Sequence, residues 1–410
     1  MARPSRHRSS IVAVNLTFAA ICLLAVPSSQ AQTFNVLHNF TFAGDGGFPS
    51  AGVTLGAGGN LYGTTYDGGS GGYGVVYKLA HASSGWTLTP LYSFQGGADG
   101  GYPEARVIFG SDGTLYGTTS AGGDNGNGTV FRLRPQPQAC KTALCPWSET
   151  VLYRFQGGSD GGAPGYGDLT FDSTGNIYGT TVGGGLQSCD GGSCGVVFKL
   201  TPSGSNYTES VLYSFTGGND GANPYSGVIF DSTGNLYGTA YSGGANSAGT
   251  VYELVSSGSG WTEKTLNDFP PAGGSGYPIG GLTLDSQGNL FGTGFVGGTV
   301  FELMPSGGDW AFTLLHTFDG FDGPFGSLTR DAAGNLYGTN ATGGPYDNGV
   351  VFKLTPSGSA WTYTDLYDFT GGNDGGFPVS NVVIDGKGNL YGTAYLGGTD
   401  GGGVVWEITP

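Results

Sequence analysis

Histidine, the side chain most often used as a general acid or base, is rare in this sequence. The 410 residues include only 4 histidines, and those beyond the N-terminal segment are His38, His81 and His316. His38 and His316 take the same place in two separate copies of a phrase, Leu-His-Asn-Phe and Leu-His-Thr-Phe, and His81 lies in a serine-rich turn. These positions assemble neither a general base nor a two-histidine metal site. We therefore expect no catalytic residues and no cofactor site.

Literal matches to two catalytic or nucleotide-binding motifs do not change this expectation. Segments 68–72 and 157–161 match G-x-S-x-G, and segment 69–74 matches G-x-G-x-x-G. Both motifs require a helix directly after the loop, and here a strand or another loop follows. In a chain with 84 glycines such matches arise by chance.

Aspartate recurs at one place in a glycine-rich loop, and serine (Ser275) takes that place in one copy. A hard cation such as calcium binds several oxygens, so a calcium site is one interpretation. Each loop offers a single carboxylate, however, and a turn aspartate that accepts hydrogen bonds from nearby backbone N–H groups explains the same pattern. We favour the structural role and keep calcium as the alternative. The aspartates are Asp45, Asp99, Asp160, Asp220, Asp322 and Asp374.

Four cysteines beyond the N-terminal segment form two local pairs, Cys140 with Cys145 and Cys189 with Cys194. In an exported chain, two short-loop disulfides are the simplest interpretation. A zinc site is the alternative, but no histidine lies near either pair.

The phrase Leu-Tyr-Gly-Thr recurs seven times with small changes, at intervals of 54, 62, 59, 54, 46 and 54 residues. In the copy at 224–269, segments 227–230, 236–241, 250–254 and 261–269 alternate apolar and polar residues between glycine-rich turns, which indicates four strands joined by hairpins. A four-strand meander of this length is typical of a propeller blade. Sandwiches seldom repeat one unit seven times, and parallel solenoid coils are shorter.

The two ends of the chain indicate how a ring would close. Segment 33–40 matches the fourth strands of other copies, and segment 404–408 matches a third strand with no fourth after it. The N-terminal strand is therefore expected to complete the last blade and hide the open strand edges. We predict an all-β, seven-bladed propeller of four-stranded antiparallel blades over 32–410. Its units lie near 49–94, 103–155, 164–215, 224–269, 278–318, 325–369 and 378–410 plus 33–40.

Phrases such as Asn176-Ile-Tyr-Gly-Thr-Thr181 followed by Gly195-Val-Val-Phe-Lys-Leu-Thr-Pro-Ser-Gly204 resemble the GloVer tandem repeat. The resemblance spans nearly all of 33–410 and implies an exported bacterial protein. That family is named for several C-terminal anchors, whereas this sequence stops at Pro410 without such a tail, so tethering stays open. The resemblance implies no catalytic residues.

Residues 1–31 read as a cleavable signal peptide. Basic residues precede an apolar run over 11–26, and Ser29-Gln30-Ala31 offers a small-x-small cleavage site. We expect a secreted or periplasmic protein, monomeric and without membrane insertion after cleavage. The formal net charge of −16 disfavours nucleic acid as a partner.

Both the longer connections within blades and the connections between blades should emerge on one face, where binding usually occurs on a rigid scaffold. Aromatic residues follow the aspartate loops, with Tyr166 and Tyr225 slightly displaced, and they could stack on sugars or pack blades together. Their recurrence favours packing. The departures from symmetry are the insertion at 134–145, the segment 183–195 and the shortened blade near 294–299, and a ligand site is expected first beside Asp160, Asp190 and the shortened blade. The ligand-face candidates are Asp160, Asp190, Tyr102, Tyr277, Phe325 and Phe377.

These observations favour a non-enzymatic binding module whose partner is a carbohydrate or a protein of the cell envelope. The first alternative is a hydrolase or lyase acting at the channel mouth, which would show paired ionisable groups in a central pocket. The second alternative is a structural surface protein.

Overall fold

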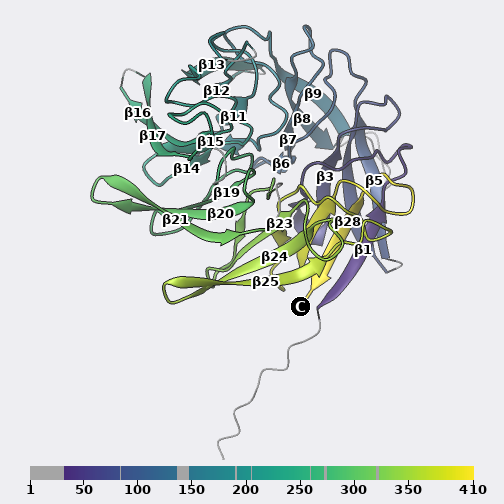
Figure 1. The fold of residues 1–410 in the computed structure, drawn as a ribbon. Coiled ribbons are helices and arrows are strands. Elements are labelled where there is room, and N and C mark those ends of the chain that lie inside the picture. The colour runs from purple at the N-terminus through teal and green to yellow at the C-terminus, as the bar shows by residue number, and fades with distance from the viewer. Residues whose placement is uncertain are drawn as a thin grey trace, which may run out of the picture. The chain divides into compact units, whose positions relative to one another are not determined.

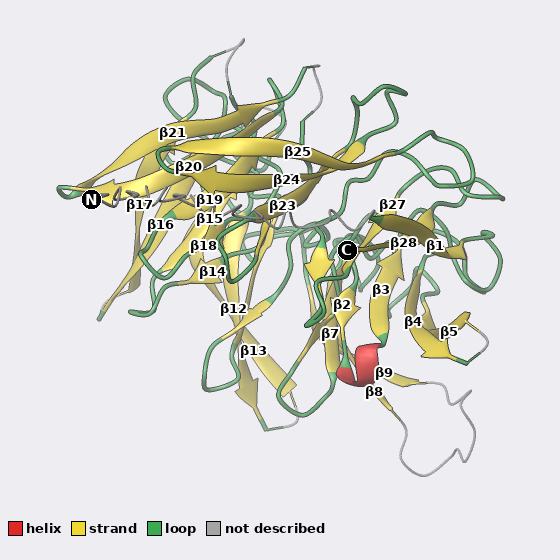
Figure 2. Cartoon of the chain, turned by 90° about the horizontal axis from the view of Figure 1, so that it is seen from below, coloured by secondary structure: helices red, strands yellow, loops and turns green. Residues whose placement is uncertain are grey.

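The computed structural model describes residues 32–83, 85–135, 147–189, 192–204, 206–258, 260–271, 275–319 and 323–410. In these ranges the chain forms strands β1 to β28 and one short 3-10 turn, η1 (Ala57–Gly59). Figure 2 shows this composition, with strands in yellow and the turn in red. The strands form seven four-stranded antiparallel sheets arranged around an axis, so the predicted seven-bladed propeller is confirmed (Figure 1).

Each blade runs from a two-residue innermost strand to an outer strand. Blade 1 is β2 (Thr54–Leu55), β3 (Leu61–Thr65), β4 (Val75–Ala82) and β5 (Gly85–Ser93). Blade 2 is β6 (Ile108–Phe109), β7 (Leu115–Thr119), β8 (Thr129–Pro135) and β9 (Trp147–Arg154). Blade 3 is β10 (Thr170–Phe171), β11 (Ile177–Thr181), β12 (Val196–Ser203) and β13 (Asn206–Ser214). Blade 4 is β14 (Ile229–Phe230), β15 (Leu236–Ala240), β16 (Thr250–Ser257) and β17 (Gly260–Asp268).

The remaining blades follow the same order. Blade 5 is β18 (Thr283–Leu284), β19 (Leu290–Gly294), β20 (Thr299–Ser306) and β21 (Asp309–Thr317). Blade 6 is β22 (Thr329–Arg330), β23 (Leu336–Asn340), β24 (Val350–Ser357) and β25 (Ala360–Asp368). Blade 7 is β26 (Val383–Ile384), β27 (Leu390–Ala394), β28 (Val404–Thr409) and β1 (Thr33–Asn39). The innermost strand of blade 4 is thus shorter than the predicted 227–230, because the residues before Ile229 form the segment that lines the axis.

The ring closes where the two ends of the propeller pair. Strand β1 runs antiparallel to β28, with Thr33 opposite Thr409 and Asn39 opposite Val404. Figure 1 shows the purple β1 beside the yellow β28. The pairing completes blade 7 as the sequence predicted.

The glycine of the Leu-Tyr-Gly-Thr phrase lies beneath an aromatic ring of the third strand. Gly238 pairs with Tyr252, and a Cβ at Gly238 would lie 2.4 Å from the Tyr252 hydroxyl. The same arrangement occurs in every blade, so these glycines are required for close approach. The pairs are Gly63–Tyr77, Gly117–Phe131, Gly179–Phe198, Gly238–Tyr252, Gly292–Phe301, Gly338–Phe352 and Gly392–Trp406.

Two of these buried aromatic rings carry a hydroxyl that the fold does not use. The hydroxyls of Tyr77 and Tyr252 are buried without a hydrogen-bond partner among the described residues, and burial raises the pKa of both. Since four other blades place phenylalanine here, we expect Tyr252→Phe to stabilise the protein by about 1 kcal/mol, the cost of an unsatisfied buried hydroxyl. Denaturant unfolding measures this change. Tyr213→Phe is the control, because its hydroxyl donates to Asp220 at 2.9 Å, and that variant should lose stability.

Tryptophans at the start of the fourth strands join neighbouring blades. Trp147 packs on Tyr62 and Trp310 on Tyr237, with ring centroids 6.3 and 6.1 Å apart. Trp86 packs on Tyr391 at 6.3 Å, across the closure of the ring. These three tryptophans therefore pack neighbouring blades against one another.

Three glutamates of the fourth strands lie between blades, each near an aspartate of the preceding blade. Burial is the largest cause that raises their pKa to about 7, and the charge of the aspartate adds to it. The pairs are Glu149 with Asp99, Glu209 with Asp160, and Glu263 with Asp220.

Stability is therefore expected to fall as the pH rises from about 4.5 to 7. Over this range the unfolded chain, whose glutamates have a pKa near 4.3, releases protons that the folded chain retains, so rising pH favours the unfolded state. We expect a melting temperature several degrees lower at pH 8 than at pH 5.5. The triple variant Glu149→Gln, Glu209→Gln and Glu263→Gln should make this profile shallower in thermal scans, and Glu104, whose pKa is also raised to about 7, should retain part of the slope. Glu253→Gln, the control, should leave the slope unchanged.

No helix among the described residues is long and apolar enough to cross a membrane.

Candidate functional site

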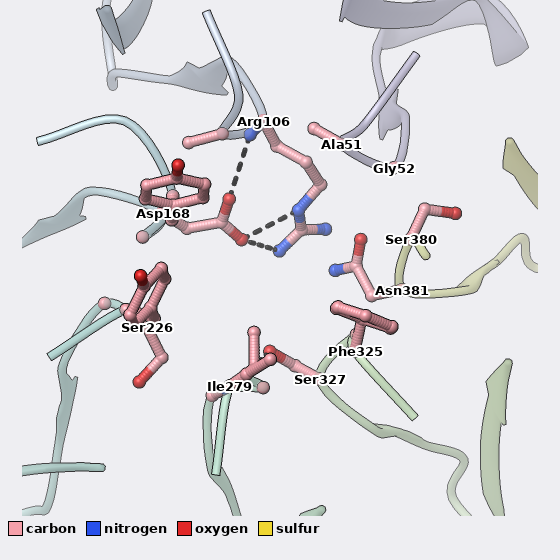
Figure 3. A pocket seen from close by; sticks show the side chains of 18 of the residues that line it. Ala51, Gly52, Arg106, Asp168, Ser226, Ile279, Phe325, Ser327, Ser380 and Asn381 are labelled. Carbon is pink, nitrogen blue, oxygen red and sulfur yellow. Dashed lines mark hydrogen bonds and ion pairs between the residues drawn. The ribbon is translucent and has the colours of Figure 1, made fainter. Parts of the chain in front are cut away.

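A pocket of about 650 Å³ lies on the axis of the ring. All seven blades line it with the segments that precede their innermost strands, and the residues after two second strands, Tyr66 and Tyr395, add to the wall. Figure 3 shows these segments converging from all sides. An axial pocket with contributions from every repeat is a place where a few exceptional residues can create an asymmetric site.

Aromatic rings form much of the pocket wall. Tyr166 and Tyr225 lie with centroids 4.9 Å apart, and Phe325 and Phe377 lie 5.9 Å apart. Further rings pack behind the wall, since Tyr66 stacks on Tyr102 at 4.8 Å and Tyr395 stacks on Phe48 at 4.9 Å. The wall is therefore held by packing between blades, and it still presents rings to the cavity.

An ion pair between the neighbouring blades 2 and 3 lies in the pocket wall. The Arg106 guanidinium donates to Asp168 Oδ2 from Nε at 2.8 Å and from Nη2 at 2.5 Å, and the Arg106 backbone N–H donates to Oδ1 at 3.1 Å. With its carboxamide oxygen turned toward the guanidinium, Asn381 accepts from Nε, Nη1 and Nη2 at 3.0–3.1 Å. Figure 3 shows Arg106 between Asp168 and Asn381, which come from blades 3 and 7. These three side chains break the sevenfold symmetry at the axis.

An extra residue in blade 3 places Asp168 there. Five residues separate Pro164 from β10, whereas four separate Pro103 from β6. This extra residue disturbs a bond between blades that the rest of the ring makes. In six blades the threonine hydroxyl of the Leu-Tyr-Gly-Thr phrase donates to a backbone carbonyl of the next blade, as from Thr180 to Ser226 at 2.7 Å. The Thr118 hydroxyl, which faces blade 3, is buried without a partner among the described residues.

Glu104 is a second carboxyl group in the pocket wall, besides Asp168. Its carboxylate accepts from the Ser120 hydroxyl at 3.0 Å and from the hydroxyl of Tyr166. Burial raises the pKa of Glu104 to about 7, and these two hydrogen bonds oppose the rise. A carboxyl group with a raised pKa thus lies in a pocket lined by aromatic rings.

The predicted ligand-face residues fall in different places. Phe325 and Phe377 line the axial pocket. Tyr102 and Tyr277 pack behind it, on Tyr66 at 4.8 Å and on Tyr241 at 5.3 Å. Asp160 is not among the residues that line the pocket, and Asp190 lies outside the described residues. The described residues of the segments 183–195 and 294–299, whose asymmetry suggested a ligand, do not line this pocket.

The recurring aspartates act as acceptors within their own loops. Asp220 accepts from the Thr216 backbone N–H at 2.8 Å and from the Tyr213 hydroxyl at 2.9 Å. Asp45, Asp99, Asp160 and Asp374 accept in the same way. This is the geometry that the turn interpretation predicts; the calcium alternative stays untested, and Asp322 lies outside the described residues. Within the described ranges, no three His, Cys, Asp or Glu side chains gather as metal ligands.

His38 and His316 take the fourth-strand places that the sequence predicted. His81, predicted in a serine-rich turn, lies instead in β4, because that strand continues to Ala82 and pairs His81 with Trp86, whose ring centroid is 5.1 Å away. His38 Nε2 lies 3.0 Å from Asp45 Oδ2, where other blades use tyrosine. His316 stacks on Tyr363 at 4.1 Å, in a different blade from His38. The disulfide between Cys189 and Cys194 is formed, as predicted, and the pair Cys140–Cys145 lies outside the described residues.

Sequence reasoning missed Glu104, Arg106, Asp168 and Asn381. A comparison of the segments that follow the first proline of each repeat could have found two of these residues. At the third residue after that proline most copies have glycine or serine, whereas blades 2 and 7 have Arg106 and Asn381.

The chain resembles several solved structures. Virginiamycin B lyase from Staphylococcus aureus superposes with a TM-score of 0.56 at 16% identity, over 92% of this chain and 99% of that chain. The extracellular domain of a candidate hybrid two-component system from B. thetaiotaomicron gives 0.56 at 12% identity, over 91% of this chain and 39% of that one. A candidate 6-phosphogluconolactonase from Bacteroides uniformis gives 0.52 at 16% identity, over 82% and 88%. At these identities the likeness shows the fold alone.

No curated protein matches the sequence. The family model described as the Gloeobacter/Verrucomicrobia repeat matches residues 26–165, 144–323 and 294–410, which together span the propeller. The chain therefore belongs to the family of the Gloeobacter/Verrucomicrobia repeat.

Proposed function

We propose that this protein is an exported binding protein that holds a saccharide in the axial pocket. The observation that supports this proposal is a cavity of about 650 Å³ whose wall of tyrosine and phenylalanine rings surrounds Arg106, Asp168 and Asn381. Sugars present apolar C–H faces that stack on aromatic rings, and hydroxyls that bond to fixed polar groups. A concave, largely preformed site of this size and composition suits a ligand of one to three sugar units.

The asymmetry of the pocket also favours binding over a purely structural role. Stability alone gains nothing from the extra residue in blade 3, since it leaves the buried Thr118 hydroxyl without a partner among the described residues. Its consequence at the axis is the pairing of Asp168 with Arg106. Sequence features that lower the stability of a repeat are often found at functional sites.

Isothermal titration of the purified protein with three trisaccharides tests the proposal: cellotriose, N-acetylated chitotriose and its deacetylated form, the glucosamine trimer. We expect measurable binding of at least one of them. Tyr166→Ala should weaken that binding about tenfold to thirtyfold, as removal of an aromatic anchor does. Tyr346→Ala is the matched control, because Tyr346 is 58% exposed and does not line the pocket. Absence of binding by all three, or equal losses in both variants, would contradict the proposal.

We infer export from the signal-peptide pattern of residues 1–31, and the Cys189–Cys194 disulfide supports this proposal because disulfides persist in oxidising compartments. Cell fractionation and N-terminal sequencing of the released protein test it. The expected N-terminus is Gln32, and an intact N-terminus on a cytoplasmic protein would contradict export.

A second candidate function is cleavage of the bound saccharide, by a hydrolase or lyase. Glu104 favours it, since a carboxyl group with a pKa near 7 can donate or accept a proton at neutral pH. Incubation of the same trisaccharides with the protein, followed by product analysis, distinguishes cleavage from binding. Products that form with the native protein and not with Glu104→Gln would establish an enzyme.

A further inference from the structure

Glu104 is an acidic side chain of the axial pocket that has no cationic partner. The ion pairs among the described residues do not include it, and the guanidinium of the same pocket, Arg106, is engaged by Asp168. The partners of Glu104 are the neutral hydroxyls of Ser120 and Tyr166. A carboxylate in this position attracts a positive charge from a ligand.

The fold itself does not require a carboxyl group at this place. Glu104 is the first residue after the proline that begins the second repeat. At the corresponding place the other blades have residues without charge, and they close the ring equally well. These residues are Ser50, Gly165, Tyr225, Ile279, Phe325 and Val379.

Aromatic rings surround the same carboxylate. Tyr66, Tyr166 and Tyr395 line the same pocket as Glu104, and the Tyr166 hydroxyl donates to its carboxylate. After burial, the charge of Glu104 is the next largest cause that raises the pKa of these three tyrosines. Aromatic faces attract cations, most strongly where water is partly excluded. The charges of Arg106 and Asp168 cancel, so ionised Glu104 sets the charge of these three side chains at −1.

We propose that the saccharide of the axial pocket carries a protonated amino group, as glucosamine does, and that this ammonium lies between Glu104 and the rings of Tyr66 and Tyr166. This inference rests on the proposed function and specifies its ligand class. The net charge of −16 acts in the same direction, because it attracts cationic oligosaccharides and repels uronates.

The trisaccharide panel tests this inference at pH 7 by titration calorimetry. The glucosamine trimer is expected to bind at least tenfold more tightly than cellotriose or N-acetylated chitotriose, since an ion pair with cation–π support is lost in both. Glu104→Gln should abolish the preference for the amine, measured within that variant as the ratio of its affinities for the glucosamine trimer and for cellotriose. Glu253→Gln removes the same charge outside the pocket and should preserve the preference.

Each contrary outcome has its own meaning. Equal affinity for all three trisaccharides, or tighter binding of a neutral one, would overturn the amino-sugar inference and leave the proposed function intact. A preference that survives in Glu104→Gln, or that disappears equally in Glu253→Gln, would also overturn it. No binding by any of the three would defeat the inference and the proposed function together.

Discussion

Replacement of Gly392 by alanine is expected to destabilise the protein by about 3 kcal/mol, at the upper end of the range for overpacking a core. A Cβ at this position would lie 2.3 Å from Cζ2 and 2.8 Å from Cε2 of Trp406. Trp406 is fully buried in blade 7, so its ring has no space to move away. Because blade 7 closes the ring, we also expect increased aggregation. Denaturant unfolding measures the first effect and light scattering the second.

Gly386→Ala is the matched control for this change. Gly386 lies in the hairpin turn of the same blade, and a Cβ there would meet nothing within 4 Å. Other copies carry a side chain at this place, for example Ser232 and Ala332. The control should change stability by less than about 0.5 kcal/mol. Equal losses in the two variants would refute the steric role of the glycine beneath the third-strand aromatic.

Replacement of Arg106 by alanine is expected to weaken saccharide binding about 100-fold. Arg106 joins Asp168 to Asn381, so its loss leaves a carboxylate without its cation and a carboxamide without its donors. Arg106→Lys should cost about tenfold, because an ammonium cannot reproduce the planar, multiple donation of a guanidinium. Titration calorimetry with the tightest-binding trisaccharide measures both changes.

The stability cost of Arg106→Ala should be smaller than its effect on binding. The side chains of Arg106 and Asp168 are 26% and 31% exposed, so solvent screens part of their attraction. Arg134→Ala is the control, because Arg134 pairs with Asp112 at 3.1 Å on the exposed surface, away from the pocket. If a folded Arg106→Ala variant bound the saccharide as tightly as the native protein, the Arg106–Asp168 ion pair would have no part in binding.

The fold can be predicted from the sequence because every copy of the repeat shows the same strands and turns. Hairpin turns such as Asp231 to Asn235 recur with the acceptor that organises them, since Asp231 accepts from the Asn235 backbone N–H at 2.9 Å. The N-terminal segment 33–40 matches a fourth strand and the last copy has no fourth strand of its own. This difference alone predicts that the two ends pair and close the ring. Periodicity shows such features directly because each copy repeats them.

The candidate site escaped the same reasoning because it depends on what the copies do not share. The innermost strands are only two residues long. Such a short strand shows no alternation of apolar and polar residues, so the sequence does not indicate which of the preceding residues face the axis. Long loop insertions are conspicuous in the sequence. The insertion that places Asp168 beside Arg106 is a single residue between Pro164 and Thr170. Packing between blades and lining of the cavity are also compatible roles for one aromatic residue. Phe325 and Phe377 do both, since each packs on another ring and faces the cavity.

A crystal structure with the tightest-binding of the three trisaccharides tests the central claim most directly. We predict that the ligand lies on the axis of the ring, with a sugar ring against Tyr166 or Tyr225 and a hydroxyl in contact with Asn381. A trisaccharide bound on the outer strands or beside the Cys189–Cys194 disulfide, with the axial pocket holding only solvent, would contradict it.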